Sequence, residues 1–114
     1  MDDRVTGIGL VAAGGAVGAA LRYGVGLAVA GPAGTLLVNV AGSLLLGVLV
    51  SRTLPKRVQL FAATGLCSSF TTYSTFAVDA VSFGSAPEAA AYVAATYVFG
   101  VAAATAGLAV GGGR

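Results

Sequence analysis

The stretch "YGVGLAVAGPAGTLLVNVAGSLLLGVLVS" (residues 23–51) contains no charged side chain and consists mostly of alanine, glycine, valine and leucine. Three other stretches of the chain are also free of charge, namely 5–21, 58–78 and 89–113. An α-helix needs about 20 apolar residues to cross the hydrocarbon core of a bilayer. Because proline and glycine do not continue a helix, "AGPAGT" (30–35) divides the long stretch between two helices.

The composition of the whole chain indicates a membrane protein. Of its 114 residues, 57% are hydrophobic and 9% are charged, whereas about 25% of the residues in a soluble domain are charged. We therefore predict an all-α membrane protein in which residues 1–114 form one domain of four transmembrane helices. Strands are not expected, because alternation is absent and an open sheet edge is unsatisfied in lipid. The predicted spans are 5–29, 35–54, 58–83 and 88–110.

The distribution of positive charge predicts an orientation in the plasma membrane. With four spans, both termini lie on the same side as the loop "SRTLPKR" (51–57). The opposite side has Arg22 alone. The positive-inside rule therefore places the termini and this loop in the cytoplasm. The basic residues on the cytoplasmic side are Arg4, Arg52, Lys56, Arg57 and Arg114.

The chain offers few residues for enzyme chemistry. It has no histidine, four carboxylates and one cysteine, Cys67, so we predict neither a zinc site nor an intrachain disulfide. We expect no organic cofactor and no nucleic-acid partner, and the chain is not predicted to be an enzyme. A small multidrug transporter would need a membrane-embedded glutamate in its first span, but 5–21 is uncharged. A non-conducting membrane assembly subunit remains an alternative to a channel.

Polar residues recur along the third predicted span, in "GLCSSFTTYSTFAVDA" (65–80). Side chains three or four residues apart share a helix face, and this spacing predicts one polar stripe. Serine and threonine in membrane helices also bond their own backbone or join neighbouring helices, which is the structural alternative. Asn39 in the second span strengthens the case for a polar pathway. The predicted stripe consists of Ser68, Thr72, Thr75, Asp79 and Ser82.

The chemistry of these groups favours an anion. Hydroxyls and the amide of Asn39 donate hydrogen bonds, and the edges of aromatic rings carry partial positive charge. Cation pathways use rings of carboxylates or carbonyls instead. The residues alone therefore predict a pathway for a small anion without identifying it. The fourth span adds further polar side chains, which are Tyr92, Thr96, Tyr97 and Thr105.

Three blocks of the sequence resemble the small fluoride channels known as the CrcB or Fluc family. The blocks are "GGAVGAALRY" (14–23), "GTLLVNVAGSLLLG" (34–47) and "TGLCSSFTTYSTF" (64–76), in the order and spacing of the family. The resemblance implies an antiparallel dimer with two pores at the interface. Each pore would carry fluoride passively out of the cell and so confer resistance to fluoride.

The resemblance also implies roles for individual residues. Asn39 matches the asparagine that donates to fluoride, and Tyr73 and Phe76 match two phenylalanines whose ring edges face the ion. Arg22 and Asp79 match residues with a structural or vestibule role. The polar track beside the pore would consist of Thr72, Ser74, Thr75, Tyr97 and Thr105.

The family further implies that the third helix is broken at its midpoint and that freed carbonyls hold a central sodium ion. By alignment, those carbonyls belong to Ser68 and Thr71. This chain departs from the family at two points. Ser68-Ser69 replaces a Gly-Gly pair, which tolerates a broken backbone more readily, and Tyr73 adds a hydroxyl to the usual phenylalanine.

The charge distribution leaves two assemblies open. An antiparallel homodimer needs a chain that inserts in both orientations, but five basic residues on one side against one on the other favour a single orientation. A heterodimer with a homologous subunit of opposite orientation, in which one pore has degenerated, is therefore the alternative to a homodimer. In either case the expected partners are fluoride, sodium, membrane lipid and a second subunit.

Overall fold

The computed structural model describes residues 3–112, and every regular element in this range is a helix. The three long helices are α1 (Asp3–Ala28), α2 (Pro32–Ser51) and α6 (Ala86–Gly112). The remaining segment is built from short pieces, namely α3 (Lys56–Val58), the π-helix η1 (Gln59–Cys67), α4 (Ser68–Phe70) and α5 (Ser74–Val81). The predicted all-helical fold is therefore confirmed.

Three of these helices, α1, α2 and α6, are long and apolar enough to cross a membrane. Many of their large apolar side chains lie on the outside of the chain, among them Ile8, Leu27 and Phe99. Few large side chains are buried within one copy. An apolar surface of this extent is expected of helices that contact lipid or other apolar protein surfaces, and it does not suit a water-facing exterior.

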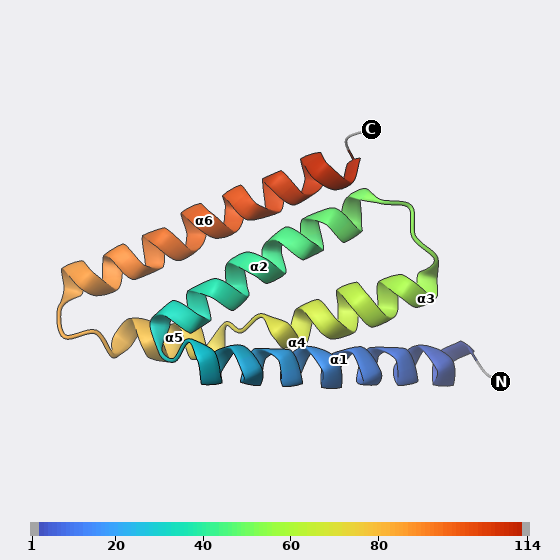
Figure 1. Cartoon of the computed structure of the whole chain (residues 1–114), viewed down its shortest axis with the longest axis horizontal. Coiled ribbons are helices and arrows are strands. Elements are labelled where there is room, and N and C mark those ends of the chain that lie inside the picture. Colours follow the sequence, from blue (N-terminus) through green and yellow to red (C-terminus); the bar gives the residue numbers. More distant parts are fainter. Residues whose placement is uncertain (1–2, 113–114) are drawn as a thin grey trace.

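The helices form two pairs that lie side by side (Figure 1). α2 packs along α6, and α1 packs along η1 and α4. The beginning of α1, the connection between α2 and α3, and the end of α6 lie at one end of the molecule (Figure 1). Arg4, Arg52, Lys56 and Arg57 therefore share that end, whereas Arg114 lies outside the described residues.

Local sequence determines where the helices begin. Gly31 has a φ of 78°, a conformation that glycine adopts readily, and Pro32 then occupies the first turn of α2. For this reason α2 begins at Pro32, three residues before the predicted span. At the start of α6, Ser85 Oγ accepts from the Glu88 amide at 3.3 Å and donates to the Glu88 carboxylate at 2.9 Å. Ser85 is therefore the N-cap of α6, and its hydroxyl also holds the Glu88 side chain.

Glycine allows the paired helices to approach each other at the backbone. A Cβ atom at Gly14 would collide with the carbonyl oxygen of Phe61, and one at Gly18 would collide with that of Leu66. Gly14 and Gly18 thus form a small-residue face that admits the backbone of η1 in the same chain. In the other pair, Gly107 of α6 lies equally close to the backbone of α2.

The third predicted span, 58–83, is not one continuous helix. The helical segments end at Phe70 and resume at Ser74, so the predicted midpoint break is present. We call residues 71–73 the helix break. The prediction that Ser68, Thr72, Thr75, Asp79 and Ser82 form one stripe is wrong, because spacing by three and four aligns residues only along an uninterrupted α-helix. The Ser82 hydroxyl bonds back to the Val78 carbonyl at 2.6 Å.

Candidate ion-binding site at the helix break

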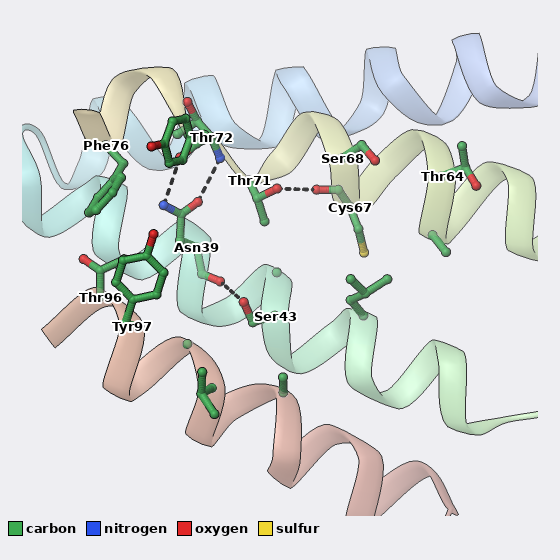
Figure 2. A pocket seen from close by; sticks show the side chains of 17 residues that line it. Asn39, Ser43, Thr64, Cys67, Ser68, Thr71, Thr72, Phe76, Thr96 and Tyr97 are labelled. Carbon is green, nitrogen blue, oxygen red and sulfur yellow. Dashed lines mark hydrogen bonds between the residues drawn. The ribbon is translucent and has the colours of Figure 1, made fainter. Parts of the chain in front are cut away.

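Asn39 holds the helix break from the neighbouring helix α2. Its Nδ2 donates to the Thr72 carbonyl at 3.0 Å, and its Oδ1 accepts from the Thr72 amide at 2.8 Å. Figure 2 shows the two bonds side by side. The side-chain amide thereby replaces both helical partners that Thr72 lacks. Because Nδ2 carries two hydrogens, one N–H remains for another acceptor.

The Ser68 and Thr71 carbonyls are among those that the break leaves without their helical partners. In a continuous helix the Ser68 carbonyl would accept from the Thr72 amide, which here donates to Asn39. The Thr71 carbonyl would accept from the Thr75 amide, which here donates to Thr72 Oγ1 at 3.1 Å. These are the two carbonyls that the resemblance assigns to a sodium ion. Carbonyl oxygens freed in this way suit a hard cation.

A groove of about 710 Å³ runs past the break between α2, η1–α4 and α6. We call it the Asn39 groove. None of the residues that line it is charged, so its polarity comes from hydroxyls, the Asn39 amide and the backbone. The predicted residues that line it are Asn39, Ser68, Thr71, Thr72, Tyr73, Phe76 and Tyr97, several of which appear in Figure 2.

Aromatic rings surround Phe76 at one end of this groove. Phe76 is 7% exposed and contacts Tyr73, Tyr92 and Tyr97 at centroid distances of 5.8, 5.5 and 6.1 Å. Its contact with Tyr97 is edge-to-face, with an interplanar angle of 90°. Tyr73 and Tyr97 are 74% and 57% exposed, so one side of this aromatic cluster is open in the single chain.

A second cavity, of about 380 Å³, lies on the other side of Thr72. We call it the Asp79 pocket. Thr35 Oγ1 donates to the Asp79 carboxylate at 2.6 Å, which orients the acid. Arg22 and Thr75 also line the pocket. Thr72 lines both cavities, so the helix break lies between the Asn39 groove and the Asp79 pocket.

Arg22 reaches the break from α1. Its Nε donates to the Ser69 carbonyl at 3.0 Å across 47 residues of sequence. This oxygen is freed by the end of α4, and the bond to a guanidinium is charge-assisted. Arg22 therefore contacts the broken backbone as well as the Asp79 pocket.

Two predicted pathway residues are not brought to either cavity. Ser74 and Thr105 are exposed and line neither the Asn39 groove nor the Asp79 pocket. The last residue of α6 that lines the groove is Ala104, so Thr105 lies just beyond its end. In this single chain the two hydroxyls have no part in the site.

The structure adds three residues to the candidate site. Thr35 was not assigned from the sequence, and Tyr92 and Thr96 were noted there only as polar residues of the fourth span. Tyr92 is 8% exposed, and its hydroxyl lies near Thr35 and Asp79 without a hydrogen-bond partner among the described residues. Thr96 lines the Asn39 groove. In the sequence, the available signal was a tyrosine and a threonine one turn apart in an otherwise apolar span.

The site as a whole combines hydrogen-bond donors, ring edges and a broken backbone without a charged side chain in the groove. Such a lining can replace the hydration shell of a small anion, because hydroxyl, amide and aromatic C–H groups all present positive ends. No cluster of three or more metal-binding side chains occurs among residues 3–112.

The sequence of this helical membrane protein matches a known family. Residues 9–108 match the family described as "CrcB-like protein, Camphor Resistance (CrcB)". Since this match covers most of the chain, the chain belongs to the CrcB family.

Several relatives are similar along most of their length. "Fluoride-specific ion channel FluC 2" of Halobacterium salinarum is 50% identical over 108 residues, which cover 89% of this chain and 83% of the relative. "Fluoride-specific ion channel FluC" of Agrobacterium fabrum is 45% identical over 91% of this chain and 94% of the relative. "Fluoride-specific ion channel FluC 1" of Haloarcula marismortui is 52% identical over 82% and 76%, respectively.

Proposed function

We propose that this chain forms a fluoride-specific ion channel, which lets fluoride leave the cell passively and so limits its toxicity. Membership of the CrcB family and the names of its relatives support this function. The single structural observation that carries it is the uncharged, donor-lined Asn39 groove at a broken helix. The chain is accordingly a channel subunit rather than an enzyme.

Passage through the groove requires fluoride to lose water, and the lining compensates for that loss. The free N–H of Asn39 and the hydroxyl of Thr72, which accepts from the Thr75 amide and keeps its own hydrogen, offer strong donors. The ring edges of Phe76 and its neighbours add weaker ones. Fluoride is the smallest halide and the strongest hydrogen-bond acceptor among them, so a narrow lining of this kind favours it over chloride.

A second subunit is needed to close the groove. Tyr73 and Tyr97 are largely exposed, and a pore open along one side would admit lipid instead of holding an ion. We place a second subunit over this face, in the antiparallel orientation that the family resemblance implies. The segment 56–81 would then cross the membrane as a broken helix, as the third of four spans in the subunit.

The freed carbonyls of Ser68 and Thr71 fit a sodium ion. Their amide partners are engaged by Asn39 and by Thr72 Oγ1, which leaves both oxygens available. A sodium ion bound there would supply positive potential beside the anion pathway. In this assignment serine at 68 and 69 does not prevent the break, and Ser69 has its own carbonyl satisfied by Arg22.

The decisive experiment measures fluoride efflux from liposomes that contain this chain alone. We expect rapid release of fluoride and retention of chloride, read by ion-selective electrodes. A non-conducting assembly subunit or a multidrug-type transporter would release neither ion passively. Absence of fluoride release from a folded, reconstituted protein would contradict a homomeric channel.

A heterodimeric channel is the second candidate, and one observation favours it. Arg4, Arg52, Lys56 and Arg57 lie at one end of the molecule, so the cytoplasm is the expected location of that end in the plasma membrane. Relatives numbered FluC 1 and FluC 2 are consistent with paired subunits. In that case the chain alone would release no fluoride, and efflux would appear only with a homologous partner of opposite orientation.

A further inference from the structure

We propose that Arg22 is a positioning residue that fixes where the third helix breaks. The helical segments of residues 56–70 end at Phe70, and the last carbonyls of any helix lack intrahelical donors. Arg22 supplies a donor to one of them, the Ser69 carbonyl, at 3.0 Å. Its positive charge also lies at the negative end of the helix dipole, where a cation is favourable.

The packing of α1 places Arg22 at this point and nowhere else along the segment. Gly14, Gly18 and Arg22 are spaced by four residues, so they share one face of α1. A side chain at either glycine would collide with the η1 backbone, which shows that α1 lies directly on η1 there. One turn beyond Gly18, this face meets the end of α4. The glycine contacts therefore fix the position of α1 along η1, and this position brings Arg22 to the Ser69 carbonyl.

Arg22 and Asn39 hold the break from opposite sides. Arg22 of α1 satisfies the backbone before the break, and Asn39 of α2 satisfies both backbone groups of Thr72 within it. Among the described residues, no other side chain donates to the Ser69 or Thr72 carbonyl. Without Arg22, the Ser69 carbonyl would be left unsatisfied in a membrane environment, and residues 68–71 would rearrange to pair it. The Thr71 carbonyl and the Asn39–Thr72 contact would move with them.

Cys67 provides a direct readout of this rearrangement. It is the only cysteine of the chain, it is 3% exposed, and its carbonyl accepts both the Thr71 amide at 3.1 Å and the Thr71 hydroxyl at 3.0 Å. Cys67 therefore belongs to the last turn before the break. If that turn loosens, the thiol becomes accessible to a small maleimide in detergent solution.

The experiment compares Arg22→Gln, Arg22→Lys and the matched loop variant Arg52→Gln in the full chain. Arg22→Gln should react with N-ethylmaleimide at Cys67 at least about tenfold faster than the unsubstituted chain, because a lost hydrogen bond of this kind shifts local opening by about that factor. Arg22→Lys keeps a cation and a donor and should react at the original rate. Arg52→Gln, which removes the same charge from an exposed loop, should also be unchanged.

An unchanged labelling rate in folded Arg22→Gln would overturn the proposal. If that variant does not fold, Arg22→Lys decides: the original rate supports the role, and labelling as fast as in the denatured chain refutes it. The fluoride readout rests on the proposed function, since Arg22→Gln should also lose efflux and Arg22→Lys should retain it. Labelling is independent of that function. A chain that conducts no fluoride but shows the expected labelling pattern would contradict the channel function and still support the role of Arg22.

Discussion

Asn39 is the residue on which the geometry of the site depends most directly. Its amide makes two hydrogen bonds to the backbone of Thr72, at 3.0 and 2.8 Å. It thereby takes the place of the two backbone groups that would pair with Thr72 in a continuous helix. The sequence suggested only that Asn39 donates to an ion. In the structure its first role is to hold the break, and one N–H remains for the ion that the proposed function requires.

Replacing Asn39 should therefore damage structure and conduction together. Asn39→Ala leaves the Thr72 amide and carbonyl unsatisfied, which should cost about 1–3 kcal/mol in the free energy of unfolding. We expect fluoride efflux to fall about tenfold or more, in line with a barrier raised by at least about 1.4 kcal/mol. Ser82→Ala is the control, because the Ser82 hydroxyl donates to the Val78 carbonyl and lines neither cavity. Normal efflux in Asn39→Ala would contradict this role.

Tyr73 tests the importance of ring edges against that of hydroxyls. The residue is 74% exposed and contacts Phe76 through its ring, and no hydrogen bond of its hydroxyl occurs among the described residues. Tyr73→Phe keeps the ring edge, so liposome efflux should stay within about threefold of the original rate, the effect of less than 1 kcal/mol. A severe loss would instead identify the Tyr73 hydroxyl as an essential donor.

At the scale of the helices, backbone contact at glycine decides how α1 sits on η1. Leu, Val and Ile supply no hydrophobic driving force between helices in lipid, so close approach and packing hold membrane helices together. Gly14 and Gly18 make that approach possible, and they also bring Arg22 to Ser69. The packing of one helix pair thus sets the geometry of a break in another element.

Two glycines of α1 provide a matched comparison for this packing. A Cβ at Gly18 would collide with the Leu66 carbonyl, whereas one at Gly24 has nothing within 4 Å. Gly18→Ala should lower the unfolding temperature in detergent, because overpacking typically reduces the free energy of unfolding by about 1–3 kcal/mol. Gly24→Ala should be neutral or stabilising by about 0.5–1 kcal/mol, since alanine favours the helix interior. Equal effects of the two substitutions would rule out the close contact.

For the whole molecule, the end-to-end distribution of charge governs insertion. Arg52, Lys56 and Arg57 lie in the short connection between α2 and η1, and Arg4 shares their end of the molecule (Figure 1). Glu88 and Asp79 lie toward the other end. Short basic loops next to membrane helices are retained in the cytoplasm, so this asymmetry favours one orientation over the other.

Fusions at the C-terminus can measure this orientation. A fluorescent protein, which folds in the cytoplasm, should be bright, and an alkaline phosphatase, which folds outside it, should be inactive. The triple variant Arg52→Gln, Lys56→Gln and Arg57→Gln removes the charge of the loop and should give both signals at once. Equal signals from the original chain would show that it inserts both ways and would favour a homodimer.

Much of this protein follows from the sequence alone. Charge-free stretches separated by proline and glycine defined the helical membrane class, because hydropathy and turn chemistry are local properties. The motifs around Asn39 and Phe76 predicted the family, and the family match confirmed it. The same motifs predicted a broken third helix. The regular stripe failed for that reason, since it assumed helical spacing across Thr71–Tyr73.

Only the tertiary structure decided which polar groups meet. Asn39 pairs with Thr72, Thr35 with Asp79 and Arg22 with Ser69 across 33, 44 and 47 residues of sequence. No periodicity links residues that far apart. Their contact depends on how α1 and α2 lie against the broken helix, which is set by glycines that admit backbone against backbone and by a turn that opens at Gly31. The hydropathy of the sequence predicts that these polar side chains lie within membrane helices, and the packing of the helices determines which partner each of them contacts.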